Sequence, residues 1–306
     1  MIKFKKILFI IVPVILLVAV FLNFDKIKDE FKTIFNYRDE LVILPSNQYT
    51  KNYDFLFVQR NESYIPNNYN DLLNIFYSVL NNGWEEFTFY CSTDYENCLK
   101  DIDKISHDQV LLADINNYVN PFNSYSSIRT LYDDTGEVTI IVHHLYNNEE
   151  VKSLYQDIKK IVDSNVSPSM SDERKIQVLH DYIINNTKYD SVRAKDGDSS
   201  YDSARINGLL YQHYALCSAY TDTMAVMLDY LNIHNFKVST DNHVWNAVYV
   251  EGSWKHLDLT WDDPVTSSGK DMLSNEYFLI DTDDLLSIKD SYKQHTFDRN
   301  RYLEFK

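Results

Sequence analysis

The chain has 306 residues, of which 44% are apolar and 14% aromatic, so it can bury a core and is not a disordered protein. Six glycines and six prolines exclude collagen-like and low-complexity chains. The formal net charge of -16 argues against a nucleic-acid partner, because nucleic-acid-binding proteins carry basic surfaces that neutralise phosphates.

The N-terminus has the pattern of a membrane segment. Three lysines within residues 1–6 precede an unbroken apolar run from Ile7 to Leu22. As a helix these residues would span roughly 24 Å, a little short of a bilayer core, and basic flanking side chains can extend that reach. A cleaved secretory signal would need small residues before the cut site, and Ala19 is the only one near the end of the run.

We therefore expect a cytoplasmic basic tip at residues 1–6, a transmembrane signal anchor at 7–23 and a stalk or linker at 24–50. The remainder would be extracytoplasmic, because the basic flank stays inside. This predicts a single-pass protein of the cell membrane that contacts the membrane through its N-terminal helix. A secreted protein with a cleaved signal is the alternative.

Three cysteines, Cys91, Cys98 and Cys217, would then lie in an oxidising compartment. Cys91 and Cys98 are separated by six residues and could close a small loop by a disulfide. Cys217 would remain as the odd thiol, which marks it as a candidate reactive group. Three free, partly buried thiols are the other interpretation.

Residues 51–166 predict a small α+β domain. Apolar residues recur at helical spacing between Leu72 and Leu80, and Gly83 ends that helix. Strands are expected at 85–92 and at Glu137–Tyr146, and a second helix at 151–162. This region contains no recognisable catalytic constellation.

Residues 167–306 predict a second domain. A helix should begin after Ser171, and the stretch from Ser191 to Asp202 is polar and should form a loop. A further helix is expected from about Cys217 to Leu231, followed by two strands and a C-terminal segment. Cys217 would lie at a helix N-terminus, where the dipole favours the thiolate and a backbone N–H could stabilise an oxyanion. A buried structural cysteine is the alternative.

The two strands form a predicted hairpin around Glu251-Gly252, with alternating residues on either side. A two-residue loop pairs Val250 with Ser253, which places His243 and Asp258 on one face as diagonal neighbours, about 7–8 Å apart at the backbone. A three-residue loop would turn Asp258 to the other face.

Cys217, His243 and Asp258 together provide a nucleophile, a base and a group that fixes the tautomer of the base. These segments resemble the transglutaminase-like superfamily of thiol enzymes, particularly its bacterial members. The resemblance covers about residues 170–300. It rests on ALCSAY around Cys217, NHVWNAVYVEGSW around His243 and HLDLTWDDP around Asp258, with NTKYD upstream and EYFLID downstream.

The resemblance implies a papain-like α+β core, in which a helix bearing cysteine packs on an antiparallel sheet bearing histidine and aspartate. It also implies that Cys217, His243 and Asp258 are catalytic. The same resemblance gives substrate-binding roles to the following residues: Tyr189, Trp245, Asn246 and Trp261. Family members usually show Cys-Gln-Gly-Tyr-Ala, whereas this chain has Cys-Ser-Ala-Tyr-Thr from position 217, which could alter the oxyanion region or the acyl pocket.

The predicted function is thiol-dependent acyl transfer or hydrolysis on protein or peptide amides at the cell envelope, without a cofactor. The sequence leaves transglutaminase, deamidase and cysteine peptidase open. One alternative is a catalytically weak or inactive fold used as a cell-surface binding module, which the residues after Cys217 motivate. Another is a zinc site formed by His243, His256 and Asp258, although we expect no metal and regard His256 as a packing residue.

Overall fold

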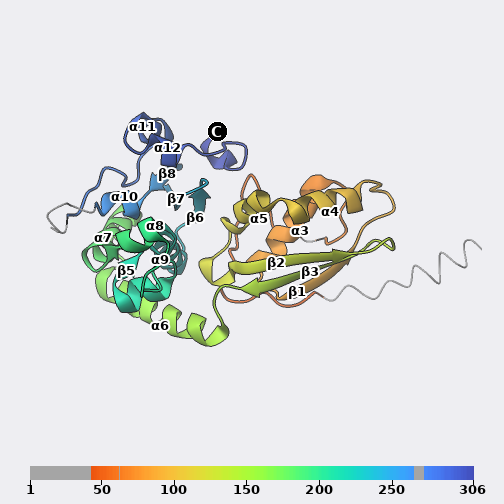
Figure 1. Cartoon of the computed structure of the whole chain (residues 1–306), viewed down its shortest axis with the longest axis horizontal. Helices are drawn as coiled ribbons and strands as arrows, with labels where there is room; N and C mark the ends of the chain where they lie inside the picture. Colours follow the sequence, from red (N-terminus) through yellow and green to blue (C-terminus); the bar gives the residue numbers. More distant parts are fainter. Residues whose placement is uncertain (1–42, 62, 265–271) are drawn as a thin grey trace, which may run out of the picture. The chain divides into compact units, whose positions relative to one another are not determined.

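The computed structural model describes residues 43–61, 63–264 and 272–306 (Figure 1). The predicted basic tip, the signal anchor and most of the stalk lie outside these ranges. Within them, no helix is long and apolar enough to cross a membrane. From residue 44 onward, the described residues pack as one compact unit of helices and mainly antiparallel strands, which confirms the α+β class. The predicted domain boundary at 166/167 stays a prediction.

The first sheet has the order β1-β3-β2 and is antiparallel throughout. Its strands are β1 (Glu86–Tyr90), β2 (Tyr125–Tyr132) and β3 (Glu137–His144). Alternate residues of β3 are buried, which is the pattern of a sheet with one covered face. The predicted strands at β1 and β3 are confirmed, and β2 was not predicted.

Three helices cover that face of the sheet, as Figure 1 shows: α3 (Tyr69–Asn81), α4 (Cys98–His107) and α5 (Gln109–Asn116). The side chain of Asn68 accepts a hydrogen bond from Asp71 N and caps α3. Gly83 follows the helix with φ +69°, a conformation that only glycine adopts without strain, so the predicted stop is confirmed.

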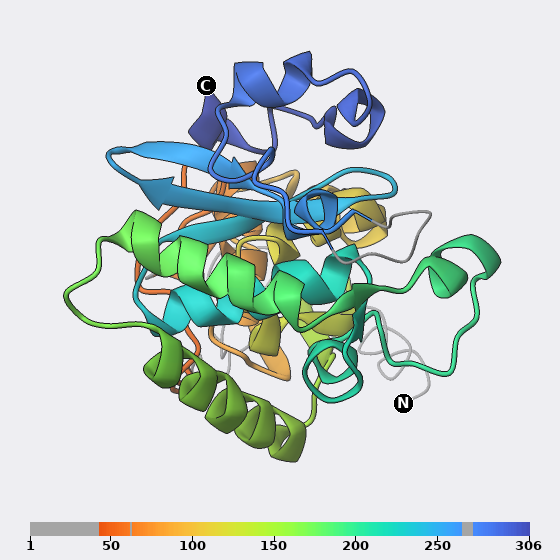
Figure 2. The same cartoon turned by 90° about the vertical axis from the view of Figure 1, so that its left-hand side faces the viewer.

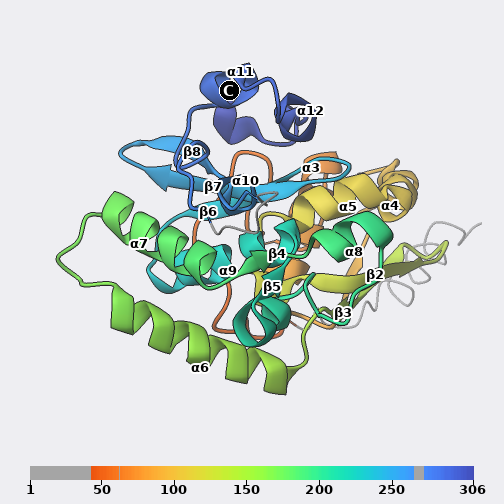
Figure 3. The same cartoon turned by 60° about the vertical axis from the view of Figure 1, so that its left-hand side comes forward.

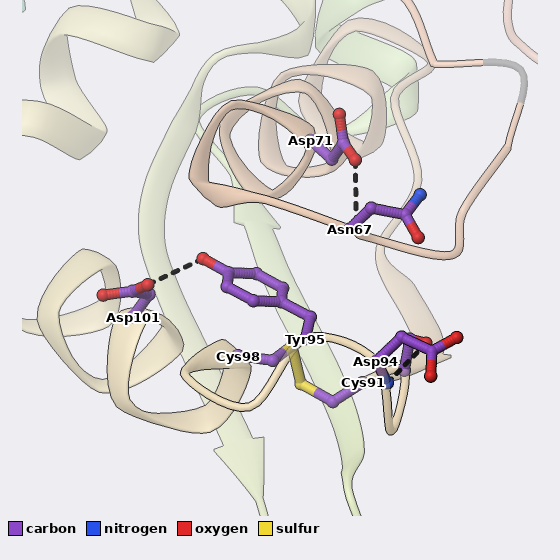
Figure 4. Close-up of a disulfide and its surroundings, with 8 residues drawn as sticks. Asn67, Asp71, Cys91, Asp94, Tyr95, Cys98 and Asp101 are labelled. Carbon is purple, nitrogen blue, oxygen red and sulfur yellow. Dashed lines mark hydrogen bonds between the residues drawn. A yellow bond between two sulfur atoms is a disulfide. The ribbon is translucent and has the colours of Figure 1, made fainter.

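Cys91 and Cys98 form a disulfide that joins the end of β1 to the start of α4 (Figure 4). Tyr95, inside the closed loop, donates a hydrogen bond of 2.6 Å to Asp101 of α4. Cys217 is the one free cysteine of the chain. Of the two interpretations of the cysteines, the disulfide is the one that the structure contains.

The second sheet is antiparallel with the order β6-β7-β8: β6 (Asn235–Ser239), β7 (Val244–Val250) and β8 (Ser253–Leu257). Val250 pairs with Ser253 across the two-residue turn, so the predicted register is confirmed. Glu251 and Gly252 have φ values of 53° and 85°, as a type I′ turn requires. The prediction of two strands was wrong in number, because β6 is a third strand whose polar residues are buried.

A central helix, α9 (Cys217–Tyr230), lies against one face of this sheet (Figure 2). Helices α6 (Asn148–Asn165) and α7 (Asp172–Asn185) pack on α9. This double covering buries every residue of α9 from Ala219 to Leu228. The opposite face of the sheet contacts the C-terminal segment, in which α11 (Thr282–Ser287), α12 (Tyr292–His295) and η3 (Leu303–Phe305) lie.

Short elements lie between α7 and α9 (Figure 3). Strands β4 (Lys188–Tyr189) and β5 (Tyr214–Ala215) pair in parallel, and a π-helical turn, η2 (Gly208–Gln212), precedes β5. The predicted loop from Ser191 to Asp202 is wrong at its start, because α8 (Ser191–Asp196) is helical. The side chain of Asp190 accepts a hydrogen bond from the backbone N–H of Arg193 and so caps the start of α8. Aspartate is a common N-cap residue, but the polar composition of the segment favoured a loop.

Candidate active site

Cys217 is the first residue of α9, in a half-buried position. Leu216 occupies the N-cap, and no side chain caps the helix. The backbone N–H groups of the first turn are therefore not occupied by a capping side chain, and the positive end of the helix dipole acts at the thiol. These N–H groups are placed to stabilise an oxyanion beside the thiol.

His243 lies immediately before β7, and two hydrogen bonds fix the start of that strand against α9. Thr221 donates its hydroxyl hydrogen to the carbonyl of Val244 at 3.0 Å. Asn246 donates its amide to the carbonyl of Thr221, also at 3.0 Å. As a result, His243 is only 6% exposed and within hydrogen-bonding reach of the Cys217 thiol.

Asp258 follows β8 and caps α10 (Leu259–Asp262). Its Oδ1 accepts backbone hydrogen bonds from Thr260 and Trp261, at 2.9 and 3.2 Å. Its Oδ2 accepts a hydrogen bond of 2.5 Å from His243 Nε2. The predicted diagonal pairing of His243 with Asp258 is therefore present, on the confirmed register of the hairpin.

The two aspartates after Trp261 hold α10 in place. Asp262 Oδ2 lies 3.1 Å from His180 Nε2 on α7, and its Oδ1 accepts the backbone N–H of Tyr277. Asp263 accepts a hydrogen bond from the hydroxyl of Tyr220 on α9. The Trp-Asp-Asp string thus connects the Asp258 turn to both neighbouring helices, which restrains the position of the Asp258 carboxylate.

His295, which the sequence did not single out, makes a second contact to Asp258. Its Nε2 lies 2.8 Å from Asp258 Oδ2, and the side chain is fully buried. A carboxylate oxygen accepts, so this nitrogen of His295 donates. His295 lies 37 residues after Asp258 in sequence, at the end of α12, and no local pattern marks it.

The electrostatics of the site favour a charged imidazole. Burial alone would lower the pKa of His243, but the negative charge of Asp258 and hydrogen bonds with Asp258 and Cys217 outweigh burial and raise that pKa to about 10. Burial alone would raise the pKa of Asp258, but the charge of His243 and hydrogen bonds from His243 and His295 hold it well below its usual range. At neutral pH the site therefore holds an imidazolium on an ionised carboxylate.

Trp245 and Asn246 lie behind the site and do not line its cavity. Both are buried, on opposite faces of β7, because the sheet is covered on both sides. The Trp245 ring stacks on His243, with centroids 5.6 Å apart, and meets His295 edge-on at 4.8 Å. These contacts orient the two imidazoles.

Tyr189 and Trp261, the other two residues with predicted substrate roles, are half-buried. Tyr189 is close enough to Cys217 for the thiolate to contribute, after burial, to raising the pKa of its phenol. Trp261 donates its indole N–H to Gln294 Oε1 at 3.0 Å and contacts the ring of His295. Neither residue lines the cavity beside the thiol.

A metal could be considered at one cluster of the described residues, His243, Asp258 and His295, whose donor atoms lie within 4.8 Å of one another. These donors are hydrogen-bonded to each other. His256, which the zinc alternative required, is not in the cluster: it accepts from Trp245 Nε1 and its Nε2 lies 3.0 Å from the Thr282 hydroxyl. Burial, followed by the charges of His295 and Arg299, lowers the pKa of His256 to about 3.

A cavity of about 510 Å³ opens beside the thiol. Cys217, Ser218 and His243 line it together with α5, and a buried ion pair between Lys237 and Asp222 (2.9 Å) lines it too. No pattern in the sequence indicated that residues of the first region reach this cavity. The arrangement can hold an acyl group against the Cys217 sulfur while His243 exchanges a proton with the leaving or attacking group.

No family model matches the chain, and no curated protein matches it. Among solved structures, one described as "Crystal structure of a TGase" aligns with 45% of this chain and 44% of its own length, at 15% identity and a TM-score of 0.34. Another, described as "a Putative Cysteine Protease from Cytophaga hutchinsonii", aligns with 48% of this chain and 65% of its own length, at 14% identity and a TM-score of 0.29. The chain thus spans less than two thirds of the length of either structure.

Proposed function

We propose that this chain is a thiol enzyme of the transglutaminase-like type, which transfers or hydrolyses acyl groups of protein or peptide amides. One observation carries the proposal: the chain's free thiol begins a helix within reach of an imidazole that is hydrogen-bonded to a buried carboxylate. Cys217 is the nucleophile, His243 the base and Asp258 the group that fixes the tautomer of His243.

The reaction proceeds in two steps. The Cys217 thiolate attacks the amide carbonyl, its sulfur forms a thioester, and the His243 imidazolium gives its proton to the departing amine. His243 then accepts a proton from water or from an amine that attacks the thioester, which releases the acid or a new amide and regenerates the thiolate. Water as the acceptor gives deamidation or proteolysis, and a lysine amine gives a cross-link.

Substrates are proposed to be proteins or peptides of the cell envelope, since the N-terminal apolar run would confine the enzyme to that compartment. The mechanism needs no cofactor.

Thiol reactivity of the purified full-length chain tests the proposal. With Cys91 and Cys98 in a disulfide, iodoacetamide reports on Cys217 alone. We expect fast alkylation at neutral pH in the unaltered chain, and strong slowing in His243→Ala. His107→Ala, at an exposed histidine of α4, serves as the control and should not slow the reaction.

Slow alkylation with a midpoint near about 8.5, unchanged by His243→Ala, is the behaviour of an ordinary thiol. That result would contradict the enzyme proposal and favour a binding module on an inactive fold.

A further inference from the structure

A second cavity, of about 610 Å³, lies next to the cavity beside the thiol. The two cavities share residues of two opposite walls: Ala113 on α5, and Ser239 to Asn242 between β6 and β7. The two cavities therefore adjoin along these shared residues, and together they line a groove between α5 and the β6–β7 connection.

Helix α5 forms one wall of this groove over its whole length. Gln109, Val110 and Asp114 line the far cavity, whereas Asn116 and the C-cap residue Asn117 line the cavity beside Cys217. Eight helical residues extend about 12 Å, which matches roughly four residues of an extended chain. The groove is therefore long enough for a polypeptide segment on one side of the reacting residue.

Hydrogen bonds hold the two walls at a fixed separation. The backbone N–H of Lys237 on β6 donates to the carbonyl of Asn117 at 2.8 Å. The side chain of Asn117 donates to Ser239 Oγ at 2.7 Å and to the hydroxyl of Tyr302 at 2.9 Å. The groove is thus preformed and needs no closure to bind a chain.

Two charged residues that line the groove, Asp241 and Lys293, have no ion pair among the residues that the structure describes, whereas its other charges are paired. Lys237 is paired with Asp222, and Arg301 lies within 4.0 Å of three carboxylates. Asp241 is exposed and lines both cavities, and it has no ion pair among the residues that the structure describes. Lys293 lines the far cavity only.

We propose that this groove binds an extended polypeptide substrate, and that Asp241 selects a lysine or arginine next to the reacting residue of that substrate. This proposal rests on the proposed acyl-transfer function and specifies its substrate class. It assigns residues of the 51–166 region, through α5, to substrate recognition. The exposed side chain of Val110 offers an apolar contact at the far end of the groove.

Peptide binding to the full-length Cys217→Ala chain tests the proposal, because this variant cannot turn substrate over. The probes are fluorescein-labelled, alanine-rich decapeptides with a central glutamine and one lysine or one glutamate at each flanking position. At one or two adjacent positions beside the central glutamine, we expect the peptide with lysine to bind about fivefold more tightly than the peptide with glutamate. This ratio is the one expected for a single solvent-exposed ion pair, here between the lysine and Asp241. Asp241→Asn should reduce that ratio below about twofold.

Ala113 provides a second variant, because it is exposed and lies in the part of the wall that both cavities share. Ala113→Trp fills the groove without altering the core, so it should weaken the binding of every peptide at least about tenfold. Ala194→Trp on α8 and Asp198→Asn, both at exposed positions outside the two cavities, are the matched controls and should bind as the parent does. Thermal midpoints establish that each variant is folded.

If the Ala113→Trp variant and the parent bind the peptides equally tightly, the proposed binding of peptides in the groove is wrong. If the lysine and glutamate peptides bind the parent equally tightly, the proposed role of Asp241 is wrong. Failure of the enzyme proposal is distinguishable, because it would appear as slow alkylation of Cys217 while peptides still bound in the groove.

Discussion

At the scale of single residues, the Asp258 carboxylate determines the properties of the site. It accepts four hydrogen bonds, two from backbone groups and two from imidazoles, and is almost completely buried. A buried carboxylate with this many donors stays ionised, and its charge stabilises an imidazolium at His243. The charge state of His243 therefore depends on Asp258, although Asp258 does not line the cavity beside Cys217.

Asp258→Asn should remove that stabilisation. Without the carboxylate, burial dominates, and the pKa of His243 should fall from about 10 to below its usual value. We expect alkylation of Cys217 in this variant to slow at neutral pH and to follow the ionisation of an ordinary thiol, with a midpoint near about 8.5. A pH profile of iodoacetamide alkylation measures this, and an unchanged profile would contradict the role given to Asp258.

The same substitution has a consequence for stability. A histidine with a raised pKa in the folded state contributes stability that is complete below about 6.5 and is lost as the pH rises through about 10. Urea unfolding between pH 6 and pH 10 should show this loss in the unaltered chain and not in Asp258→Asn. Parallel curves for the two proteins would show that His243 is not held as an imidazolium.

His295 should act by positioning Asp258. His295→Ala removes one hydrogen bond to a charged group, which costs about 1.5–3 kcal/mol near neutral pH, and should lower the rate of Cys217 alkylation. Asp258 has a lowered pKa, so its stabilisation is present above about 4 and is lost as the pH falls.

Part of the stability difference between His295→Ala and the unaltered chain should therefore disappear progressively as the pH falls below about 4. His295→Gln, which keeps an amide donor, should recover part of both effects. A difference that is the same at every pH would assign His295 to packing alone.

At the scale of elements, the junction between α9 and β7 brings nucleophile and base together. Thr221 of α9 holds Val244, the residue after His243, through its hydroxyl. Thr221→Val keeps the shape and leaves a buried carbonyl without this donor, which should cost about 1–3 kcal/mol and slow Cys217 alkylation. Chemical denaturation and alkylation measured on the same preparation check both effects.

Thr88→Val is the matched control, because the Thr88 hydroxyl forms a comparable 2.8 Å hydrogen bond to Thr139 within the other sheet. It should lower stability and leave thiol reactivity unchanged. Equal slowing by both substitutions would mean that reactivity reports on overall stability and not on the α9–β7 junction.

At the scale of the whole molecule, the site depends on packing between segments that are distant in sequence. Lys51 is fully buried and donates to Asp229 at the end of α9 and to the carbonyl of Asn235 in β6, both at 2.8 Å. Asn120 donates to the other oxygen of Asp229 at 2.7 Å. The segment that precedes the first sheet is thus fixed to the helix and the strand that carry the site.

The disulfide should contribute stability without affecting reactivity. It closes a loop of about eight residues, for which chain entropy gives about 2–2.5 kcal/mol. Replacing Cys91 and Cys98 together by serine should lower the free energy of unfolding by that amount and leave the alkylation rate of Cys217 unchanged. A large fall in the alkylation rate under conditions in which the double variant is still folded would show that the first sheet controls the thiol site directly.

The sequence by itself determined the local features. The helix that begins at Cys217, the turn at Glu251-Gly252 and the pairing of Val250 with Ser253 follow from spacing and turn chemistry within a few residues, so they could be predicted. The contact between His243 and Asp258 could be predicted from this pairing, because the register of a hairpin determines on which face each side chain lies.

Tertiary structure alone decided the rest. His295, the buried pair of Lys237 with Asp222, and the wall that α5 forms reach the site from segments that no sequence pattern connects. Strand β6 was missed for the same reason: its buried Asn235 and Lys237 contradict the usual pattern of a strand until their partners on other elements are known. Burial of polar groups is permitted by partners that are distant in sequence, and only the folded chain brings those partners together.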